Sequence, residues 1–232
     1  FYLNDILLPL NDLFAANGID TSDYVDPLIE EGTRQGTVYW VPFARSTPLF
    51  YYNKQIWQEA GLPDRGPATW DEFVEWSGQL VKREGGNTTR YAFGHPSAAS
   101  YIAWLFQPVC WQWGGRYSDP DFTIRIQEEP AVEAGRFYLA SVRDGWAVPS
   151  QDLVADFVNG AVAAMMASTG SLGGILRSAS FPVGTAFLPE GPAGFGCCTG
   201  GAGLAILKNK PREVQEAAFR WIAFATSPES TM

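Results

Sequence analysis

The sequence has few of the residues on which catalysis and metal binding most often depend. It contains one histidine, His95, and three cysteines, Cys110, Cys197 and Cys198. An odd count with two adjacent residues fits neither a disulfide framework nor a zinc site. We expect buried thiols, with a strained vicinal disulfide as the alternative for the adjacent pair. We predict no metal site and no cofactor.

Positive charge is also scarce. The chain has 16 Lys and Arg against 25 Asp and Glu, for a net charge of −9. This balance argues against nucleic acid or an anionic membrane as a partner, because both favour clustered Lys and Arg. No run of 18 apolar residues occurs, so we expect no segment to span a bilayer. The chain begins at Phe1, and we expect any targeting segment to be absent or removed.

Aromatic residues, by contrast, are abundant, with 9 Trp, 9 Tyr and 15 Phe. Trp and Tyr combine a large apolar face with a hydrogen-bond donor, which suits carbohydrate and polyol pockets, although most of them should lie in the core. The 232 residues are 46% hydrophobic and 18% charged. A chain of this length and composition can form one large folded domain or two modest ones.

Turn and cap signals divide the chain into alternating strands and helices. A β-like run covers 37–52, interrupted at Pro42 and Pro48, and Asn53 can cap the helix that follows it. Thr69 to Glu72 forms a capping box at the start of another helix. Further helices are expected over 97–113, 131–143, 152–159 and 212–226, and further strands over 90–94, 161–166, 184–188 and 201–207. The alternation predicts an α/β protein with a parallel sheet.

The motifs of nucleophilic and cofactor chemistry are incomplete. Thr169-Gly170-Ser171-Leu172-Gly173 is similar to a nucleophile elbow, but Thr169 stands where that turn requires Gly. Gly201 to Ile206 begins like a dinucleotide fingerprint and lacks its last Gly. His95, before Pro96, fits a loop or the edge of a pocket better than a metal ligand. We therefore predict that the chain is not an enzyme, and a serine-dependent esterase using Ser171 and His95 is the alternative from another class.

Small polar residues stand beside three of the expected strands. Arg45, Ser46 and Thr47 precede an aromatic strand, where a ligand cleft and a plain turn explain them equally well. Ser168 to Ser171 follows an apolar strand and could bind an anion or a polyol, although N-capping alone explains its hydroxyls better. Thr199 to Gly201 allows either close approach of a ligand to the backbone or a tight turn. The three junctions together favour a ligand site.

A longer set of motifs resembles the extracytoplasmic solute-binding proteins of ABC importers, in the family 1 type that carries sugars and sugar-like solutes. That signature is matched by Tyr52-Asn53-Lys54, Ala60-Gly61-Leu62-Pro63 and Ala68-Thr69-Trp70-Asp71-Glu72-Phe73. The resemblance continues to Ser227-Pro228-Glu229 and so covers nearly the whole chain. The branch that binds glycerol-3-phosphate and glycerophosphodiesters is resembled most by Arg45-Ser46-Thr47-Pro48, Ser168-Thr169-Gly170-Ser171-Leu172 and Gly200-Gly201-Ala202.

The resemblance implies a two-lobed α/β fold of the periplasmic-binding-protein type with a hinge between the lobes. Residues 1–49 and 190–232 would form a discontinuous first lobe, and residues 50–189 the second. The hinge strands would run near Leu49 to Tyr52 and Phe187 to Glu190. Because members of the family are considerably longer, we expect the chain to lack N-terminal and C-terminal parts.

The resemblance also implies a function in transport. The protein would capture glycerol-3-phosphate or a glycerophosphodiester such as glycerophosphocholine in the interlobe cleft and deliver it to a membrane permease. A mono- or oligosaccharide stacked on Trp104 or Trp111 is the alternative ligand. The protein would be a monomer in the periplasm or at the extracellular face of the cytoplasmic membrane, secreted or lipid-anchored.

Roles for individual residues follow from the same resemblance. Ser46, Ser171 and Gly201 would hold the phosphate or glycerol oxygens, and Trp104 would pack on the glycerol. Members of that branch have a second Trp just upstream of the one matched to Trp104. Here His95 or Tyr101 stands near that position, a difference that affects the identity of the ligand rather than that of the family. The predicted ligand-binding residues are Arg45, Ser46, Thr47, Tyr101, Trp104, Ser168, Ser171, Gly200 and Gly201.

Overall fold

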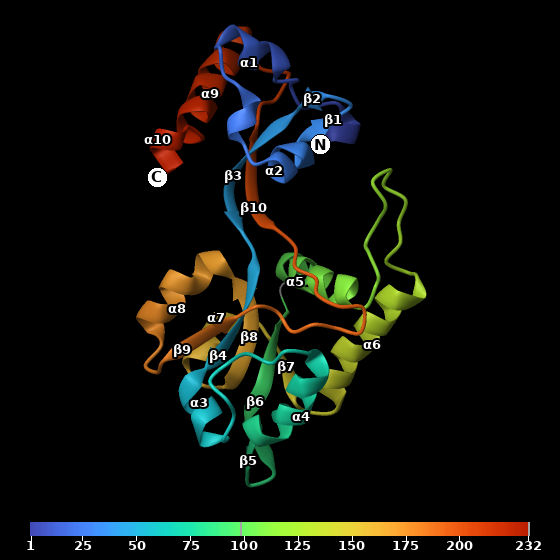
Figure 1. The fold of residues 1–232 in the computed structure, drawn as a ribbon, viewed down its shortest axis with the longest axis vertical. Helices are drawn as coiled ribbons and strands as arrows, with labels where there is room; N and C mark the ends of the chain where they lie inside the picture. Colours follow the sequence, from blue (N-terminus) through green and yellow to red (C-terminus); the bar gives the residue numbers. More distant parts are fainter. Residues whose placement is uncertain (98, 232) are drawn as a thin grey trace. The chain divides into compact units, whose positions relative to one another are not determined.

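The computed structural model describes residues 1–97 and 99–231, and the chain divides into two compact units (Figure 1). Unit 1 consists of Phe1–Arg45 and Gly201–Met232, and unit 2 of Ser46–Gly200. Unit 1 is therefore discontinuous, because the chain passes between the units twice. The boundaries expected from the sequence, at 49/50 and 189/190, both fall inside unit 2.

Unit 1 is built around a small apolar core. Phe14 of α1 (Asn11–Ala16) packs edge-to-face on Phe219 of α9 (Arg212–Ala225), with ring centroids 5.0 Å apart. Leu10, Val41 and Ile222 are buried in the same cluster. The remaining elements of this unit are η1 (Tyr2–Asn4), η2 (Thr21–Asp23), α2 (Asp26–Glu31), α10 (Pro228–Thr231) and the strand pairs β1 (Thr33–Arg34) with β2 (Thr37–Val38) and β3 (Trp40–Ser46) with β10 (Gly200–Ala205).

Unit 2 contains a six-stranded sheet in the order β5–β6–β8–β4–β9, with β7 paired to β6. The strands are β4 (Pro48–Asn53), β5 (Lys82–Glu84), β6 (Asn87–Pro96), β7 (Ala147–Ser150), β8 (Val162–Ser168) and β9 (Val183–Ala186). β6 is parallel to β7 and β8, whereas β4 is antiparallel to both β8 and β9.

The prediction of a parallel sheet is therefore wrong for β4, and also for β5, which is antiparallel to β6. β4 begins beside the residue at which β8 ends, since Pro48 pairs with Ser168, so it must run in the opposite direction. β5 and β6 are joined by Gly85 and Gly86, whose φ angles of 56° and 84° form a tight reversal. The directions of β4 and β5 are thus set by the segments that lead into and out of these strands. The hydrophobic periodicity of a strand carries no information about its direction.

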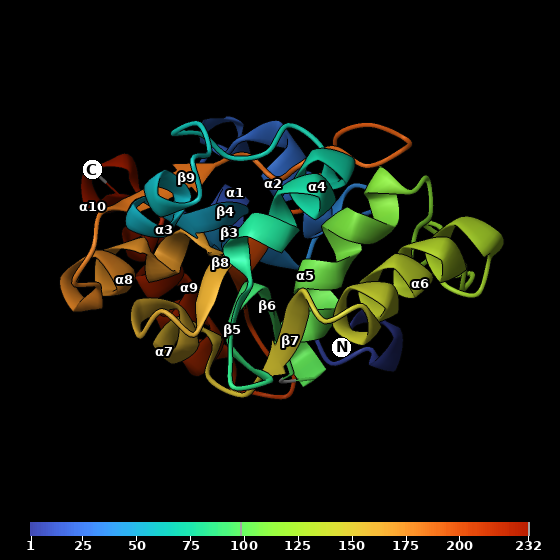
Figure 2. The same cartoon turned by 90° about the horizontal axis from the view of Figure 1, so that it is seen from below.

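Helices cover both faces of this sheet (Figures 1 and 2). Successive side chains of a strand point to opposite faces, so Phe50 and Tyr52 of β4 lie in one apolar cluster and Tyr51 in another. The first cluster includes residues of α3 (Lys54–Glu59), α4 (Trp70–Leu80), α5 (Ala99–Gln112) and α6 (Glu129–Arg143). The second includes residues of α7 (Leu153–Val158) and α8 (Leu172–Ser178).

The residues expected to form the hinge are central parts of unit 2. Leu49 to Tyr52 lies within β4, which has hydrogen-bonded neighbours on both sides, and Phe50, Tyr51 and Tyr52 are buried. The aromatic residues that identify β4 as a strand also bury it in the core of unit 2, so this segment is not a hinge. The chain crosses between the units instead at the more polar Arg45–Ser46 and at Gly200–Gly201.

The predicted caps are present. The Asn53 side chain accepts a hydrogen bond from the Ile56 amide at 3.1 Å, and Thr69 accepts one from the Glu72 amide at 3.1 Å. The Glu72 carboxylate accepts from the amide of Ala68 rather than from that of Thr69, and it also pairs with Arg65. In the described part of the chain, no helix has the length and apolar character needed to cross a membrane.

Replacing Asn53 by Ala should destabilise unit 2 by about 1 kcal/mol, because the buried Ile56 amide loses its acceptor. Asn159→Ala is the matched control, since Asn159 is an exposed residue at the opposite end of a helix, α7. Urea denaturation followed by tryptophan fluorescence measures both. Equal effects of the two substitutions would show that the cap contributes nothing.

The single histidine is a strand residue in the interior of unit 2, not a loop residue. His95 of β6 is 3% exposed, and the centroid of its ring lies 3.6 Å from that of the Tyr138 ring. Its Nε2 is 2.8 Å from the Ser141 hydroxyl. Because that hydroxyl donates to the Tyr138 carbonyl, Nε2 carries the hydrogen and donates to Ser141. Burial lowers the pKa of His95 to about 3.

The stability of unit 2 should therefore fall as the pH is lowered from about 6.5 towards 3. In this window an unfolded His95 binds a proton and the folded one does not, so protonation favours unfolding; above 6.5 the neutral ring contributes in full. Thermal midpoints of the parent protein and of His95→Gln, measured from pH 7 to pH 4, isolate this effect from carboxylate titration. The variant should show the flatter dependence, and parallel curves would contradict the assignment.

Candidate ligand-binding site

Two of the three polar junctions expected from the sequence meet at one end of the unit 2 sheet. Pro48 at the start of β4 pairs with Ser168 at the end of β8. The contact continues one residue further, because the Thr169 amide donates to the Thr47 carbonyl at 2.9 Å and the Thr47 amide donates to the Thr169 hydroxyl at 3.3 Å. The segments around Thr47 and Ser168 thus form a single polar surface.

Ser168 is held by hydrogen bonds at both of its backbone groups. Its amide donates to the Tyr101 hydroxyl at 3.0 Å, and its carbonyl accepts from the Tyr51 hydroxyl at 2.8 Å. Its own hydroxyl accepts from the Gly170 amide at 3.1 Å and caps η3 (Thr169–Ser171). Ser171, at the start of α8, makes no such capping bond. N-capping therefore explains Ser168 but not Ser171.

Two aromatic residues of α5 lie beside this turn. Tyr101 and Trp104 are three residues apart, hence on one face of the helix, and their ring centroids are 5.7 Å apart. The Trp104 indole donates to the Thr199 carbonyl at 3.2 Å. A Cβ on Gly200 would lie 2.5 Å from the indole ring, so only Gly fits there. The missing side chain at Gly200 thus serves the packing of Trp104, a reason that the sequence did not reveal.

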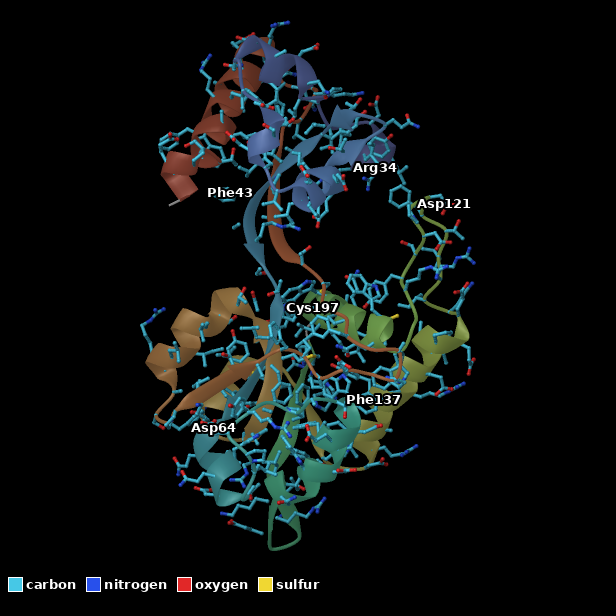
Figure 3. The ribbon with its side chains drawn as sticks, viewed as in Figure 1. Arg34, Phe43, Asp64, Asp121, Phe137 and Cys197 are labelled. Atoms are coloured by element: carbon cyan, nitrogen blue, oxygen red, sulfur yellow. The ribbon has the colours of Figure 1, made fainter. Side chains whose placement is uncertain are left out.

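The cysteines hold the third junction in place as thiols. Figure 3 labels Cys197 in the segment that leads to Gly200. Its Sγ is 3.8 Å from the Pro48 carbonyl, and the Sγ of Cys198 is 3.6 Å from the Trp104 carbonyl. All three cysteines are free, as expected. Burial raises the pKa of each thiol, that of Cys198 to about 12, so they are protonated and unreactive at neutral pH.

Arg45 and Gly201 belong to unit 1 and are not part of this surface. The Arg45 guanidinium forms an ion pair with Glu31 at 2.6 Å and lies 5.8 Å from the centre of the Trp40 ring. Gly201 has a φ of 103°, and a Cβ there would lie 1.9 Å from the Ala44 carbonyl oxygen. Gly201 therefore lets β10 approach β3 closely, a structural role within unit 1.

The unit 2 surface offers hydroxyl groups and an aromatic face without charge. Its members are Ser46, Thr47, Tyr101, Trp104, Ser168, Thr169, Ser171 and Gly200. Such a set suits the hydroxyls of a polyol or sugar and the oxygens of a phosphate, because hydroxyls can donate and accept. Among the residues that the structure describes, no three His, Cys, Asp or Glu side chains are grouped to hold a metal ion.

The geometry gives no support to the esterase alternative. His95 is buried and hydrogen-bonded to Ser141, and its pKa of about 3 makes the ring a poor base at neutral pH. The sequence also missed one residue of the site, Tyr51, whose aromatic ring in a buried strand gave no sign that its hydroxyl would reach Ser168.

The chain matches the family described as bacterial extracellular solute-binding protein over residues 2–232. A curated relative, the sn-glycerol-3-phosphate-binding periplasmic protein UgpB of Yersinia enterocolitica, is 29% identical over 199 residues, which cover 81% of this chain and 45% of the relative. The chain thus spans about half the length of that relative.

Two solved structures are similar across almost all of the chain. UgpB from Mycobacterium tuberculosis in complex with glycerophosphocholine is 46% identical, with a TM-score of 0.89, over 100% of this chain and 58% of that one. The maltose-bound MalE3 of T. maritima is 26% identical, with a TM-score of 0.79, over 97% of this chain and 59% of that one. Since the family match leaves out only the first residue, the chain belongs to the bacterial extracellular solute-binding proteins, which bind solutes and are not enzymes.

Proposed function

We propose that this chain captures glycerol-3-phosphate or a glycerophosphodiester such as glycerophosphocholine and delivers it to the membrane permease of an ABC importer. The observation that carries the proposal is the 46% identity, over the whole chain, to a protein solved with glycerophosphocholine. The similarity to a maltose-bound protein is much weaker, at 26% identity. The name of the curated relative, a glycerol-3-phosphate-binding protein, points to the same class of solute.

The unit 2 surface supports this class of solute chemically. In the proposal, Ser46, Thr47 and Ser171 hold phosphate or glycerol oxygens, Trp104 packs on the glycerol carbons, and Tyr101 and Ser168 complete this side of the site. Arg45 and Gly201 of unit 1 and Gly200 of unit 2 are further ligand-binding residues in the proposal.

The charge of the site favours a diester over glycerol-3-phosphate. The unit 2 residues are uncharged, and Arg45 is already paired with Glu31. A phosphodiester carries one negative charge, whereas a phosphomonoester carries nearly two at neutral pH. Removing the second charge from water without a cation to receive it is costly. Glycerophosphocholine is therefore the solute that we expect to bind most tightly.

A mono- or oligosaccharide is the second candidate, because sugar-binding proteins share this fold and Trp111, 36% exposed, offers another ring for stacking. The family name places the protein outside the cytoplasm, in the periplasm or at the cell surface. We propose further that it acts as a monomer, secreted or lipid-anchored, with no nucleic-acid partner.

Glycerophosphocholine should raise the thermal unfolding midpoint of the protein, and maltose should not, because a ligand stabilises the folded state that binds it. A micromolar dissociation constant corresponds to a binding free energy of about −8 kcal/mol, which a few hydrogen bonds and one aromatic contact can supply. Trp104→Ala should abolish the shift and Trp111→Ala should leave it. Stabilisation by maltose alone would replace the glycerophosphate by a sugar, and loss of the glycerophosphocholine shift only in Trp111→Ala would assign the aromatic contact to Trp111.

Gly200→Ala should weaken glycerophosphocholine binding by about tenfold or more, because the new Cβ displaces the indole of Trp104. Gly78→Ala is the matched control, since a Cβ on Gly78 in α4 would meet nothing within 4 Å. Isothermal titration gives the affinities, and near-ultraviolet circular dichroism reports the environment of the indole. An altered spectrum with unchanged affinity would remove Trp104 from the site.

A further inference from the structure

One buried tyrosine of unit 2 has a hydrogen bond that its place in the core does not require. Tyr51, in the middle of β4, is 0% exposed and packs in the cluster that contains Met165, Ala167 and Ile175. Its hydroxyl extends past this cluster to the carbonyl of Ser168, at 2.8 Å. A phenylalanine would fill the same space, so the hydroxyl is what needs an explanation.

The Ser168 carbonyl lies where the sheet cannot supply a donor. The Thr169 amide donates to the Thr47 carbonyl, so the adjacent Pro48–Ser168 pair is a non-hydrogen-bonded pair of the ladder, and the Ser168 carbonyl points away from β4. On the other side, the pairing of β8 with β6 ends at Met165, three residues earlier. The Tyr51 hydroxyl takes the place of a strand donor at this position, and an unsatisfied carbonyl there would carry a desolvation penalty.

The same peptide unit is held from the opposite direction by Tyr101. The Ser168 amide donates to the Tyr101 hydroxyl at 3.0 Å. A phenol that accepts from an amide keeps its own O–H for donation, so Tyr101 can still donate to a solute oxygen. Tyr51 and Tyr101 thus hold the residue from which the turn at Thr169–Ser171 begins.

We propose that Tyr51 is a positioning residue of the solute site, whose hydroxyl fixes the peptide of Ser168 and so sets the orientation of the Ser168–Ser171 turn and of Tyr101. The inference rests on the proposed function, since that function makes the turn part of the site. Tyr51 touches no solute itself.

The chemistry of Tyr51 suits this role over a wide pH range. Burial, followed by the nearby Tyr101, raises the pKa of Tyr51 to about 12. The hydroxyl therefore stays protonated and can donate to the Ser168 carbonyl at neutral and mildly alkaline pH.

The next residue provides a matched control. Tyr52 is also buried, and its hydroxyl is also hydrogen bonded, but to the Asp64 carboxylate at 3.0 Å. Figure 3 shows Asp64 in the segment that follows α3. Tyr51→Phe and Tyr52→Phe therefore remove the same atom from neighbouring positions of one strand, and only the first removes a bond to the turn.

The test measures amide hydrogen exchange and affinity for glycerophosphocholine in both variants of the same chain. The amides of Ser168, Thr169 and Gly170 have named acceptors in Tyr101, Thr47 and Ser168, so their exchange reports the order of the turn. We expect Tyr51→Phe to accelerate exchange at these amides and weaken binding, each by about tenfold. Tyr52→Phe should change neither, although both variants lower the thermal midpoint.

Unchanged exchange at residues 168–170 in Tyr51→Phe would overturn the proposal. Equal loss of affinity in both variants would also overturn it, because the hydroxyl would then act only through the stability of the unit. If the parent protein binds no glycerophosphate or sugar, the proposed function fails. The exchange measurement still decides in that case whether Tyr51 holds the turn.

Discussion

The antiparallel pairing of β4 with β8 is the interaction on which the architecture of unit 2 depends. It joins the two apolar clusters, because alternate residues of both strands point to opposite faces of the sheet. The same pairing brings Thr47 beside Thr169, so the polar surface is the continuation of the ladder beyond its buried part. The polar surface and the core of this unit therefore share one hydrogen-bonded frame, and a change in the register would disrupt both.

Features set by a few consecutive residues could be predicted from the sequence. Asn53 and Thr69 cap the helices that their positions indicated, because a cap needs only a side-chain oxygen and the amides of the next turn. The family motifs are also local, and they identified the solute-binding family that the match over residues 2–232 confirms. The polar junctions at Thr47 and Ser168 were recognised separately, since each follows or precedes an apolar strand.

Features that depend on how distant segments meet could not be predicted in this way. The direction of β4 is decided by where the chain enters unit 2, and the alternation of strands and helices is the same for either direction. The need for glycine at position 200 depends on Trp104, which lies far away in the sequence. The indole of Trp104 occupies the space that a Cβ at position 200 would fill. The role proposed for Tyr51 depends on β6, whose pairing with β8 ends at Met165 and so leaves the Ser168 carbonyl without a strand donor.

The bond from Trp104 to the Thr199 carbonyl has a consequence for selectivity under the proposed function. It uses the one hydrogen-bond donor of the indole. The ring then offers a solute only its electron-rich face, which attracts C–H groups and alkylated ammonium ions and is indifferent to the direction of a hydroxyl. Trp104 would therefore discriminate by flatness and polarisability rather than by hydrogen bonding, and would accept a range of substituents on one phosphoglycerol framework.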